Sequence, residues 1–162
     1  MTTANPRLVL LDANVFVSAI KDPARSTDTF RLLVHLLERA EIRITFNEVL
    51  VREYLQYAEV FPSPTAAALA SAILDRAEIV EVDDRFLKAC APYFQEGNIA
   101  DIVHAATCLQ TGALLISNDR HSEPIRKAQL IEVLTATEAV RRWVGPRSKA
   151  EDPGEAGGRG GA

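Results

Sequence analysis

Four acidic residues of this 162-residue chain stand at places where their side chains could do chemistry together. Asp12 and Asp119 each follow a short apolar segment, while Glu53 and Asp101 lie in segments with helical periodicity. Four ionised carboxylates in one pocket would repel each other unless cations joined them. Oxygen ligands without a Cys or His set select hard cations, Mg²⁺ or Mn²⁺, over zinc. Such cations can activate water and stabilise an in-line displacement at phosphorus.

Three of these acids also have purely structural explanations. Asp12 precedes an apolar helical segment and could be its N-cap, although Asn14 could cap it equally well. Asp101 comes three residues after Asn98, a spacing that resembles a capping box, although Glu or Gln is usual at that place. Asp119 belongs to an Asn-Asp pair of the kind that is common in turns. The joint arrangement of the acids has fewer such explanations.

Glu53 lies in the segment 47–60, whose helical wheel has a clear polar arc. At about 100° per residue, four residues share an arc that should face solvent: Glu48, Arg52, Gln56 and Glu59. Glu53 falls outside this arc, on the side of three apolar residues, Val49, Tyr57 and Val60. A carboxylate at the edge of a buried face is costly without a partner. A metal ion and an arginine from elsewhere in the chain are both candidates, and this helix alone does not decide between them.

The elements that must position these acids alternate between strand and helix. The predicted strands are 7–11, 42–46, 78–82, 113–117 and 130–134, and the predicted helices are 27–40, 47–60, 64–77, 83–93 and 98–111. Strands separated by helices imply right-handed crossovers and a mainly parallel five-stranded sheet, covered on both faces in an α/β fold. Ligands gather at the carboxyl edge of such sheets, where two strands run into Asp12 and Asp119.

Length and composition indicate one globular domain. The chain is 48% hydrophobic and 25% charged, which is enough to build one core. We place the domain at 1–144 and predict a disordered tail at 145–162, since GPRSKAEDPGEAGGRGGA has no apolar period. The net charge of −4 argues against a protein that coats nucleic acid by bulk attraction, but it allows basic residues gathered at one rim.

The sequence predicts a cytoplasmic protein. MTTANPR lacks the pattern of a secretion signal, and each long apolar run, such as LVLLDANVFVSAI, is interrupted by Asp or Asn, so neither export nor membrane insertion is expected. Cys90 and Cys108 lie in apolar helical patterns without a partner at zinc-finger spacing. We therefore expect buried, free thiols in a reducing compartment.

Four stretches that contain the acids and close the chain have a recognisable order: LVLLDANVFVSA, ITFNEVLVREYLQY, NIADIVHAATCLQTGALLISNDRH and VLTATEAVRRW. They resemble the PIN domain family, and specifically its VapC-like toxin branch, over residues 7–143. The most specific part runs from Asn98 to His121. There an acid, a small-residue helix, a Thr-Gly-Ala turn, a strand and a Ser-Asn-Asp ending follow in the family's order.

The resemblance implies a compact, three-layer α/β nuclease that cuts single-stranded or structured RNA with metal-activated water. It implies Mg²⁺ or Mn²⁺ as the cofactor. In toxin members a small antitoxin protein covers or disrupts the acidic pocket, and dimers are common. The resemblance therefore implies an antitoxin partner and a homodimer for this chain.

The same resemblance assigns roles to individual residues. Asp12, Glu53 and Asp101 would be metal ligands, and Asp119 would be a fourth ligand or would orient the water. The polar residues that would hold Asp12 and Asp119 in place are Asn14, Ser117 and Asn118. Four basic residues near the expected mouth could contact RNA phosphates or could be solvated loop charges: Lys21, Arg25, Arg120 and His121.

Three further residues are interpreted as structural. Asp83 and Asp84 could be mistaken for the third acid, but their place after a strand and before a helix favours caps. They end an extra Ala-rich helical stretch, 60–84, whose counterpart varies among family members. His104, one turn on from Asp101, is expected to be a helix-face residue.

Other functions remain as alternatives. A catalytically quiet PIN-like binding module would keep the fold and lose acids, whereas all four acidic positions are filled here. A non-toxin PIN ribonuclease in RNA processing would share the same acids. A haloacid-dehalogenase-like phosphatase needs an Asp where this chain has Asn14. A receiver domain needs an acid pair at the first strand and a Lys after the last strand, where Thr135 to Thr137 follow.

Overall fold

The computed structural model of this protein describes residues 7–21, 27–60 and 63–145. A five-stranded sheet in the order β3-β2-β1-β4-β5 forms its centre, and every pair of neighbouring strands runs parallel. The strands are β1 (Arg7–Leu11), β2 (Ile42–Phe46), β3 (Ala77–Ile79), β4 (Leu114–Ile116) and β5 (Val133–Leu134). The predicted α/β class with five strands is confirmed, and the sheet is parallel throughout.

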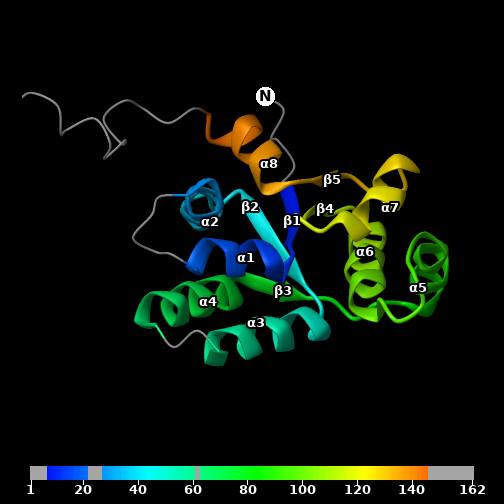
Figure 1. Ribbon diagram of the computed structural model, residues 1–162, viewed down its shortest axis with the longest axis horizontal. Coiled ribbons are helices and arrows are strands. Elements are labelled where there is room, and N and C mark those ends of the chain that lie inside the picture. Colours follow the sequence, from blue (N-terminus) through cyan, green and yellow to red (C-terminus); the bar gives the residue numbers. More distant parts are fainter. Residues whose placement is uncertain (1–6, 22–26, 61–62, 146–162) are drawn as a thin grey trace, which may run out of the picture.

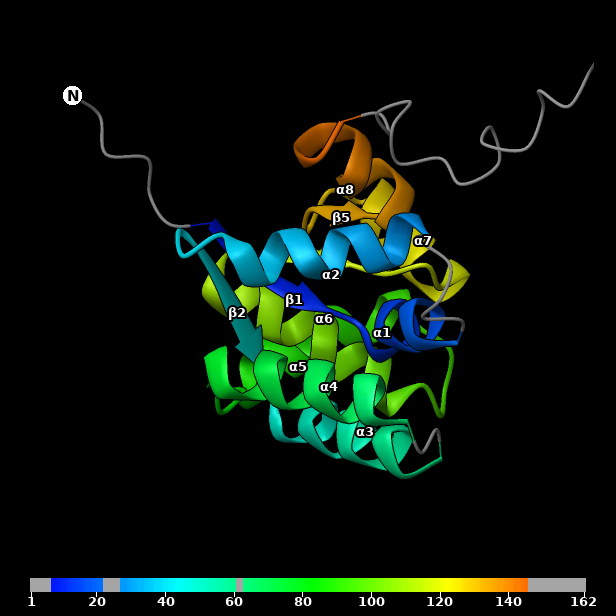
Figure 2. The ribbon, with the colours of Figure 1, turned by 90° about the vertical axis from the view of Figure 1, so that its left-hand side faces the viewer.

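Helices cover both faces of this sheet. They are α1 (Ala13–Ile20), α2 (Asp28–Glu38), α3 (Glu48–Val60), α4 (Pro64–Arg76), α5 (Asp84–Cys90), α6 (Ile99–Thr111), α7 (Glu123–Lys127) and α8 (Ala136–Trp143), with 3₁₀ turns η1 (Ala91–Tyr93) and η2 (Arg120–Ser122). Figure 1 shows α1 and α2 on one side of the strands and α5 and α6 on the other. In Figure 2, α2 and α4 lie in front of the sheet. None of the helices that the structure describes is both long and apolar enough to cross a lipid bilayer.

Three predicted strands, 78–82, 113–117 and 130–134, are shorter in the structure. The prediction for 78–82 is wrong beyond Ile79: β2 ends at Phe46, and the N–H of Val80 makes the last bond, to the Phe46 carbonyl. The Gln110 side chain then bonds the Glu81 carbonyl and the Asp83 N–H instead of a strand. The prediction for 130–134 is wrong before Val133: Gln129 adopts a left-handed backbone with φ 57°, and the chain turns before β5 begins.

The N-caps of two helices agree with the sequence prediction. Ser63 caps α4 by accepting from the Ala66 N–H, and Asp83 caps α5 by accepting from the Arg85 N–H. Asp84 lies in the first turn of α5 and pairs with Lys88, so the interpretation as a cap is confirmed for Asp83 and not for Asp84. Both cysteines are buried and free, as expected, and burial raises the pKa of the Cys90 thiol to about 11.

Tyr54 joins α3 to the end of β1. Its ring packs against Phe16 and Phe46 with centroids 4.8 Å apart in each pair. Its buried hydroxyl donates to the Leu11 carbonyl at 2.9 Å. Leu11 directly precedes Asp12, and Tyr54 directly follows Glu53, so one hydrogen bond sets the two acids' backbones relative to each other.

Tyr54→Phe is therefore expected to destabilise the fold by about 1–2 kcal/mol, because the Leu11 carbonyl loses its donor inside the core. Tyr57→Phe is the matched control, since Tyr57 is 36% exposed on the same helix. We expect its effect to stay within about 0.5 kcal/mol. Urea unfolding of both variants measures the difference, and equal losses would show that the hydroxyl of Tyr54 has no special role.

Parts of the sequence interpretation lie outside the described residues. Arg25 is one of them, and the predicted tail is another except for Gly145. The proposed domain boundary at residue 144 stays a prediction.

Candidate metal centre

Asp12 follows the last residue of β1 at the carboxyl edge of the sheet. Its N–H extends the ladder to β4 by donating to the Ile116 carbonyl at 3.0 Å. It occupies the N-cap position of α1, but its side chain makes no capping hydrogen bond. Instead Oδ2 accepts from Ser117 Oγ at 2.7 Å and from Asn14 Nδ2 at 3.3 Å. Capping therefore does not explain why this buried position carries a carboxylate.

The polar residues expected to support Asp12 divide into two groups. Asn14 and Ser117 both contact Asp12, and Ser117 Oγ also accepts from the Asp119 N–H at 3.1 Å. Asn118 differs, because its side-chain oxygen accepts from the Ala136 N–H at the start of α8. Its N–H donates to Asn14 at 3.4 Å. The structure thus brings Asn14 and Ser117 to the acids and directs the Asn118 side chain away from them.

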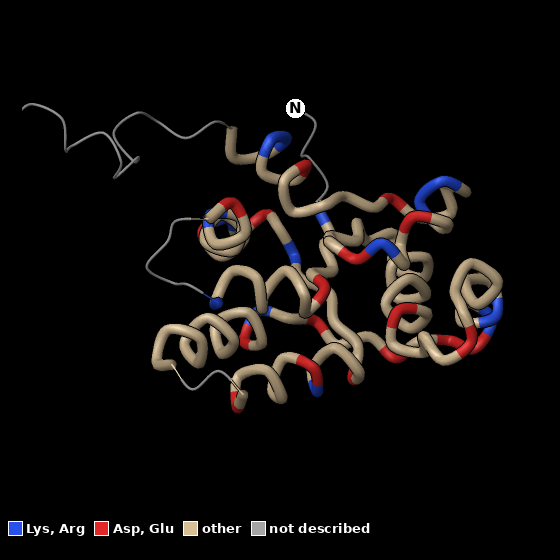
Figure 3. The backbone as a smooth tube through the Cα atoms, in the orientation of Figure 1, with Lys and Arg blue, Asp and Glu red and all other residues tan. Residues whose placement is uncertain are grey.

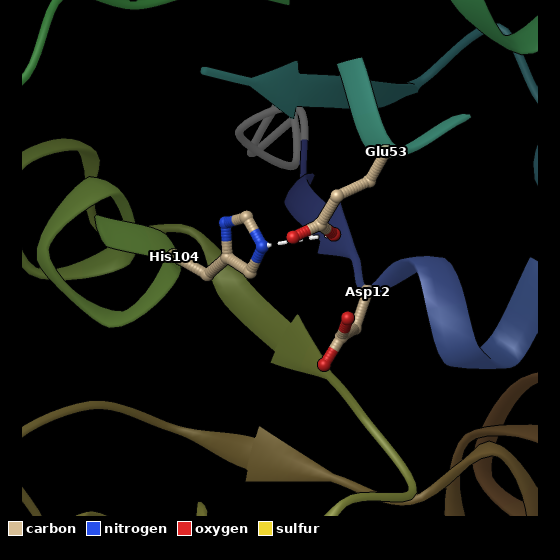
Figure 4. Close-up of side chains that lie close together, drawn as sticks. All are labelled: Asp12, Glu53 and His104. Atoms are coloured by element: carbon tan, nitrogen blue, oxygen red, sulfur yellow. Dashed lines mark hydrogen bonds and ion pairs between the residues drawn. The ribbon is translucent and has the colours of Figure 1, made fainter. Parts of the chain in front are cut away.

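Glu53 projects from α3 toward Asp12, as Figure 4 shows. Its partner is a histidine: Oε2 of Glu53 lies 3.3 Å from Nε2 of His104. One ligand atom each from Asp12, Glu53 and His104 lie within 4.8 Å of one another. The sequence left a metal ion and an arginine as possible partners of Glu53. Within the protein its partner is neither of these but the imidazole of His104.

The helical wheel of α3 predicted the solvent-facing residues correctly, but two of the three apolar residues it placed beside Glu53 are exposed. All four residues of the polar arc are exposed. However, Tyr57 is 36% exposed and Val60 is 62% exposed, while the buried residues of α3 are Leu50 and Tyr54. The wheel treats all apolar residues alike, whereas only those facing the sheet and α1 are covered. Glu53 stands next to this buried pair, at the edge of the core.

Asp101, Asp119 and His121 form a second group at the same edge. Asn98 begins α6 without a side-chain cap, and Asp101 Oδ2 instead lies 3.2 Å from Nδ1 of His121, so the expected capping box is absent. Asp119 Oδ1 accepts from the His121 N–H at 3.0 Å and lies 3.3 Å from its Nδ1. A turn role thus accounts for part of what Asp119 does. Ligand atoms of these three residues also lie within 4.8 Å of one another.

The two groups are electrically coupled. Burial raises the pKa of Asp12, His104 and the Ser117 hydrogen bond oppose this rise, and the negative charges of Glu53 and Asp101 add to it. Burial also raises the pKa of Asp101, with Asp119 adding to the effect, although the His121 hydrogen bond opposes it. The charged forms of Asp12 and Asp101 are therefore disfavoured in the protein alone, as expected for carboxylates gathered at one place.

The pH dependence of stability follows from these shifts. Because Asp12 and Asp101 have native pKa values above their ordinary 3.8, the native state holds more protons than the unfolded state above that pH. Their contribution to the free energy of unfolding falls as pH rises from about 4 through the native pKa values. We expect Asp101→Asn to stabilise the metal-free protein at pH 7 and much less at pH 4, measured by urea unfolding. A gain that grew toward low pH would contradict this sign.

Sequence reasoning missed two residues of this site. His104, expected on a helix face, is 2% exposed and contacts Glu53. Asn47 is also 2% exposed and bonds His104 from the other side. A signal for Asn47 was present, since it directly follows β2 at the edge where Asp12 follows β1. His104 stands three residues after Asp101, on the same side of a helix.

The basic residues expected at the mouth are unevenly placed. Arg120 and His121 are exposed in η2, directly after Asp119. Lys21 is exposed at the far end of α1. Since an eight-residue helix is about 12 Å long, Lys21 is not beside the acids. Figure 3 shows other basic residues scattered over outer elements such as α5, α7 and α8.

A family model matches most of this chain. The model for the PIN domain matches residues 9–128, which span β1 to α7 and include every acid of the cluster. The chain belongs to the PIN domain family. PIN domains are in general nucleases, and the predicted resemblance to this family is confirmed.

A solved structure agrees with this PIN fold. The chain is similar to a chain in the crystal structure of VapBC2 from Rickettsia felis bound to a DNA fragment from their promoter, with a TM-score of 0.54. The likeness covers 79% of this chain and 98% of that chain at 19% sequence identity. At this identity it supports a shared fold. No curated protein sequence matches this chain.

Proposed function

We propose that this PIN domain is a metal-dependent endoribonuclease and the toxin of a type II toxin–antitoxin pair. The observation that carries the proposal is the gathering of four carboxylates at one sheet edge, where burial and mutual charge raise the pKa values of Asp12 and Asp101. Among the described residues, the basic side chains within 4.0 Å of these acids are two histidines, His104 and His121, rather than Lys or Arg. Because no Lys or Arg neutralises these carboxylates among the described residues, the cluster is suited to a divalent cation.

The residues fit Mg²⁺ or Mn²⁺ by the chemistry of their donors. Asp12, Glu53, Asp101 and Asp119 would hold the ion through carboxylate oxygens, the ligands that hard cations prefer. When bound, the ion would supply an activated water and charge stabilisation at phosphorus. Neutral donors hold Asp12 from one side, because Ser117 and Asn14 both bond its Oδ2. Such orienting bonds keep a ligand's conformation without cancelling its charge.

Arg120 and His121 are the proposed contacts to the RNA substrate. Both are exposed directly after Asp119, where they could contact phosphates of a single-stranded or structured RNA. Contacts of this kind position the nucleic acid without reading its bases. Lys21 lies at the far end of α1 and would contribute only through RNA that extends beyond the acids. Arg25 lies outside the described residues and stays a candidate phosphate contact.

An antitoxin protein is the proposed partner. The similarity to a chain of the VapBC2 complex supports this branch of the PIN family, and a small protein that covers the acidic edge would silence the nuclease. We also propose that the protein is a homodimer and is located in the cytoplasm. Exposed apolar residues that a second copy could cover lie on α3, namely Leu55, Tyr57 and Val60.

Calorimetric titration of the metal-stripped protein with Mn²⁺ tests the metal centre without any choice of RNA. We expect saturable binding that is markedly weaker in Asp119→Asn, because a charged ligand is lost. Asp84→Asn is a matched control, since Asp84 pairs with Lys88 at 3.0 Å on α5. An absence of binding at millimolar Mn²⁺ would overturn the nuclease proposal and favour a PIN-like binding module.

A further inference from the structure

We propose that His104 is a positioning residue of this centre, which carries its single ring proton on Nε2 and donates it to Glu53. The inference rests on the proposed function, in which Glu53 is a metal ligand. It assigns to His104 a role different from that of a ligand, although one of its ring nitrogens lies within 4.8 Å of ligand atoms of Asp12 and Glu53. Figure 4 shows the imidazole turned toward Glu53, with Asp12 below the Glu53 carboxylate.

The argument begins at Asn47, whose amide orientation is determined by its neighbours. The Leu50 N–H, which can only donate, lies 2.8 Å from Oδ1 of Asn47. The other end of the amide is therefore the NH₂ group. One of its contacts is Thr107 Oγ1 at 2.9 Å. Thr107 donates its own proton to the Val103 carbonyl at 2.7 Å, so its oxygen accepts from Asn47.

The second contact of the Asn47 NH₂ group is Nδ1 of His104, at 3.1 Å. An NH₂ group has two protons and no free acceptor, so Nδ1 must receive a proton rather than present one. A neutral imidazole has one donor nitrogen and one acceptor nitrogen. Nε2 therefore bears the proton, and its contact with Glu53 Oε2 at 3.3 Å is a donated hydrogen bond.

Burial leaves this network few alternatives. His104 and Asn47 are 2% exposed, and Thr107 is fully buried, so solvent does not compete for the bonds. The network is also anchored at both ends, since Asn47 lies between β2 and α3 while His104 and Thr107 share one side of α6. The network thus connects the start of α3 to α6. Its other end is Glu53, which lies six residues after Asn47, less than two helical turns further along.

The consequence concerns which metal the site selects. A nitrogen binds a metal through its lone pair, and in this tautomer Nε2 has none to offer while Nδ1 is occupied by Asn47. The ligand set contributed by Asp12 and Glu53 is then oxygen only. Such a set favours Mg²⁺ or Mn²⁺, whereas an imidazole ligand would favour zinc. His104 would hold Glu53 toward Asp12, as partners behind metal ligands commonly do.

Nitrogen-15 NMR of the full chain labelled at histidine tests the tautomer directly. The chain contains three histidines, and the His104 signals are those lost in His104→Gln. We expect a protonated, pyrrole-type Nε2 and a bare, pyridine-type Nδ1, both unchanged in type when Mg²⁺ saturates the protein. A proton on Nδ1, or loss of the Nε2 proton on adding Mg²⁺, would overturn the inference.

Paired variants test the positioning role. A glutamine can place an N–H where Nε2 stands, whereas a leucine of similar size cannot. We expect Mn²⁺ affinity, measured by calorimetry, to fall about 10–100-fold in His104→Leu and to be largely restored in His104→Gln. Equal affinities in the two variants would overturn the role. Neither experiment involves RNA, so failure to cleave RNA would count against the proposed function and not against this tautomer.

Discussion

Replacing Asp12 by asparagine should abolish metal-dependent RNA cleavage while leaving the protein folded. The expected loss exceeds about 100-fold, because substitutions behind a metal ligand already cost 10–100-fold and this one removes a ligand's charge. Asparagine has nearly the same shape, and its oxygen can still accept from Ser117 Oγ, which lies 2.7 Å from Asp12 Oδ2. Removal of a like charge from a crowded pocket should also keep or raise the stability of the metal-free fold.

Cleavage of a labelled single-stranded RNA in Mg²⁺ or Mn²⁺, followed beside a thermal melt, measures both effects. Asp119→Asn should behave in the same way. Asp83→Asn is the matched control, because Asp83 caps α5 and belongs to neither acidic group. Asparagine caps a helix about as well as aspartate, so this variant should keep both stability and cleavage. Full metal-dependent cleavage by either site variant would show that the nuclease centre is elsewhere.

Glu53→Gln should weaken Mn²⁺ binding by about 10-fold or more, whereas Glu59→Gln should leave it unchanged. Both residues lie on α3, but the Glu53 side chain is 26% exposed and meets His104, while Glu59 lies exposed on the polar arc. Glutamine at position 53 can still accept the His104 N–H, so this change tests the charge and not the hydrogen bond. Calorimetry of both variants decides, and equal effects would remove Glu53 from the ligand set.

Most of the fold followed from patterns that act locally. The bounds predicted for β1 and β2 agree with the structure, and the helix predicted at 64–77 ends within one residue of α4. These segments have clear apolar periods or a cap such as Ser63, so short-range physics is enough. The predictions failed where an element depends on a distant partner. β3 ends early because β2 stops at Phe46, which no local pattern at 78–82 records.

The acids of the candidate site could be chosen from the sequence because parallel strands bring their carboxyl ends to one edge. That rule points to Asp12 and Asp119 from the order of elements along the chain. It does not say whether Asp101 caps its helix, and the structure shows that this carboxylate contacts His121 instead. The same rule applies to Asn47, which directly follows β2. However, its side chain is uncharged, and an amide at the end of a strand does not by itself indicate a site.

The amino-acid sequence was sufficient for the parallel α/β fold and for the edge where the acids gather, because the hydrophobic period and the order of elements are properties of the chain. The PIN family came from the resemblance of its motifs. Which partners meet at that edge depends on tertiary packing. His104 reaches Glu53 and Asn47 only when α3 and α6 pack together, across 51 and 57 residues of sequence. The proton on a buried imidazole depends on the donors around it in space, and spacing along the chain does not record them.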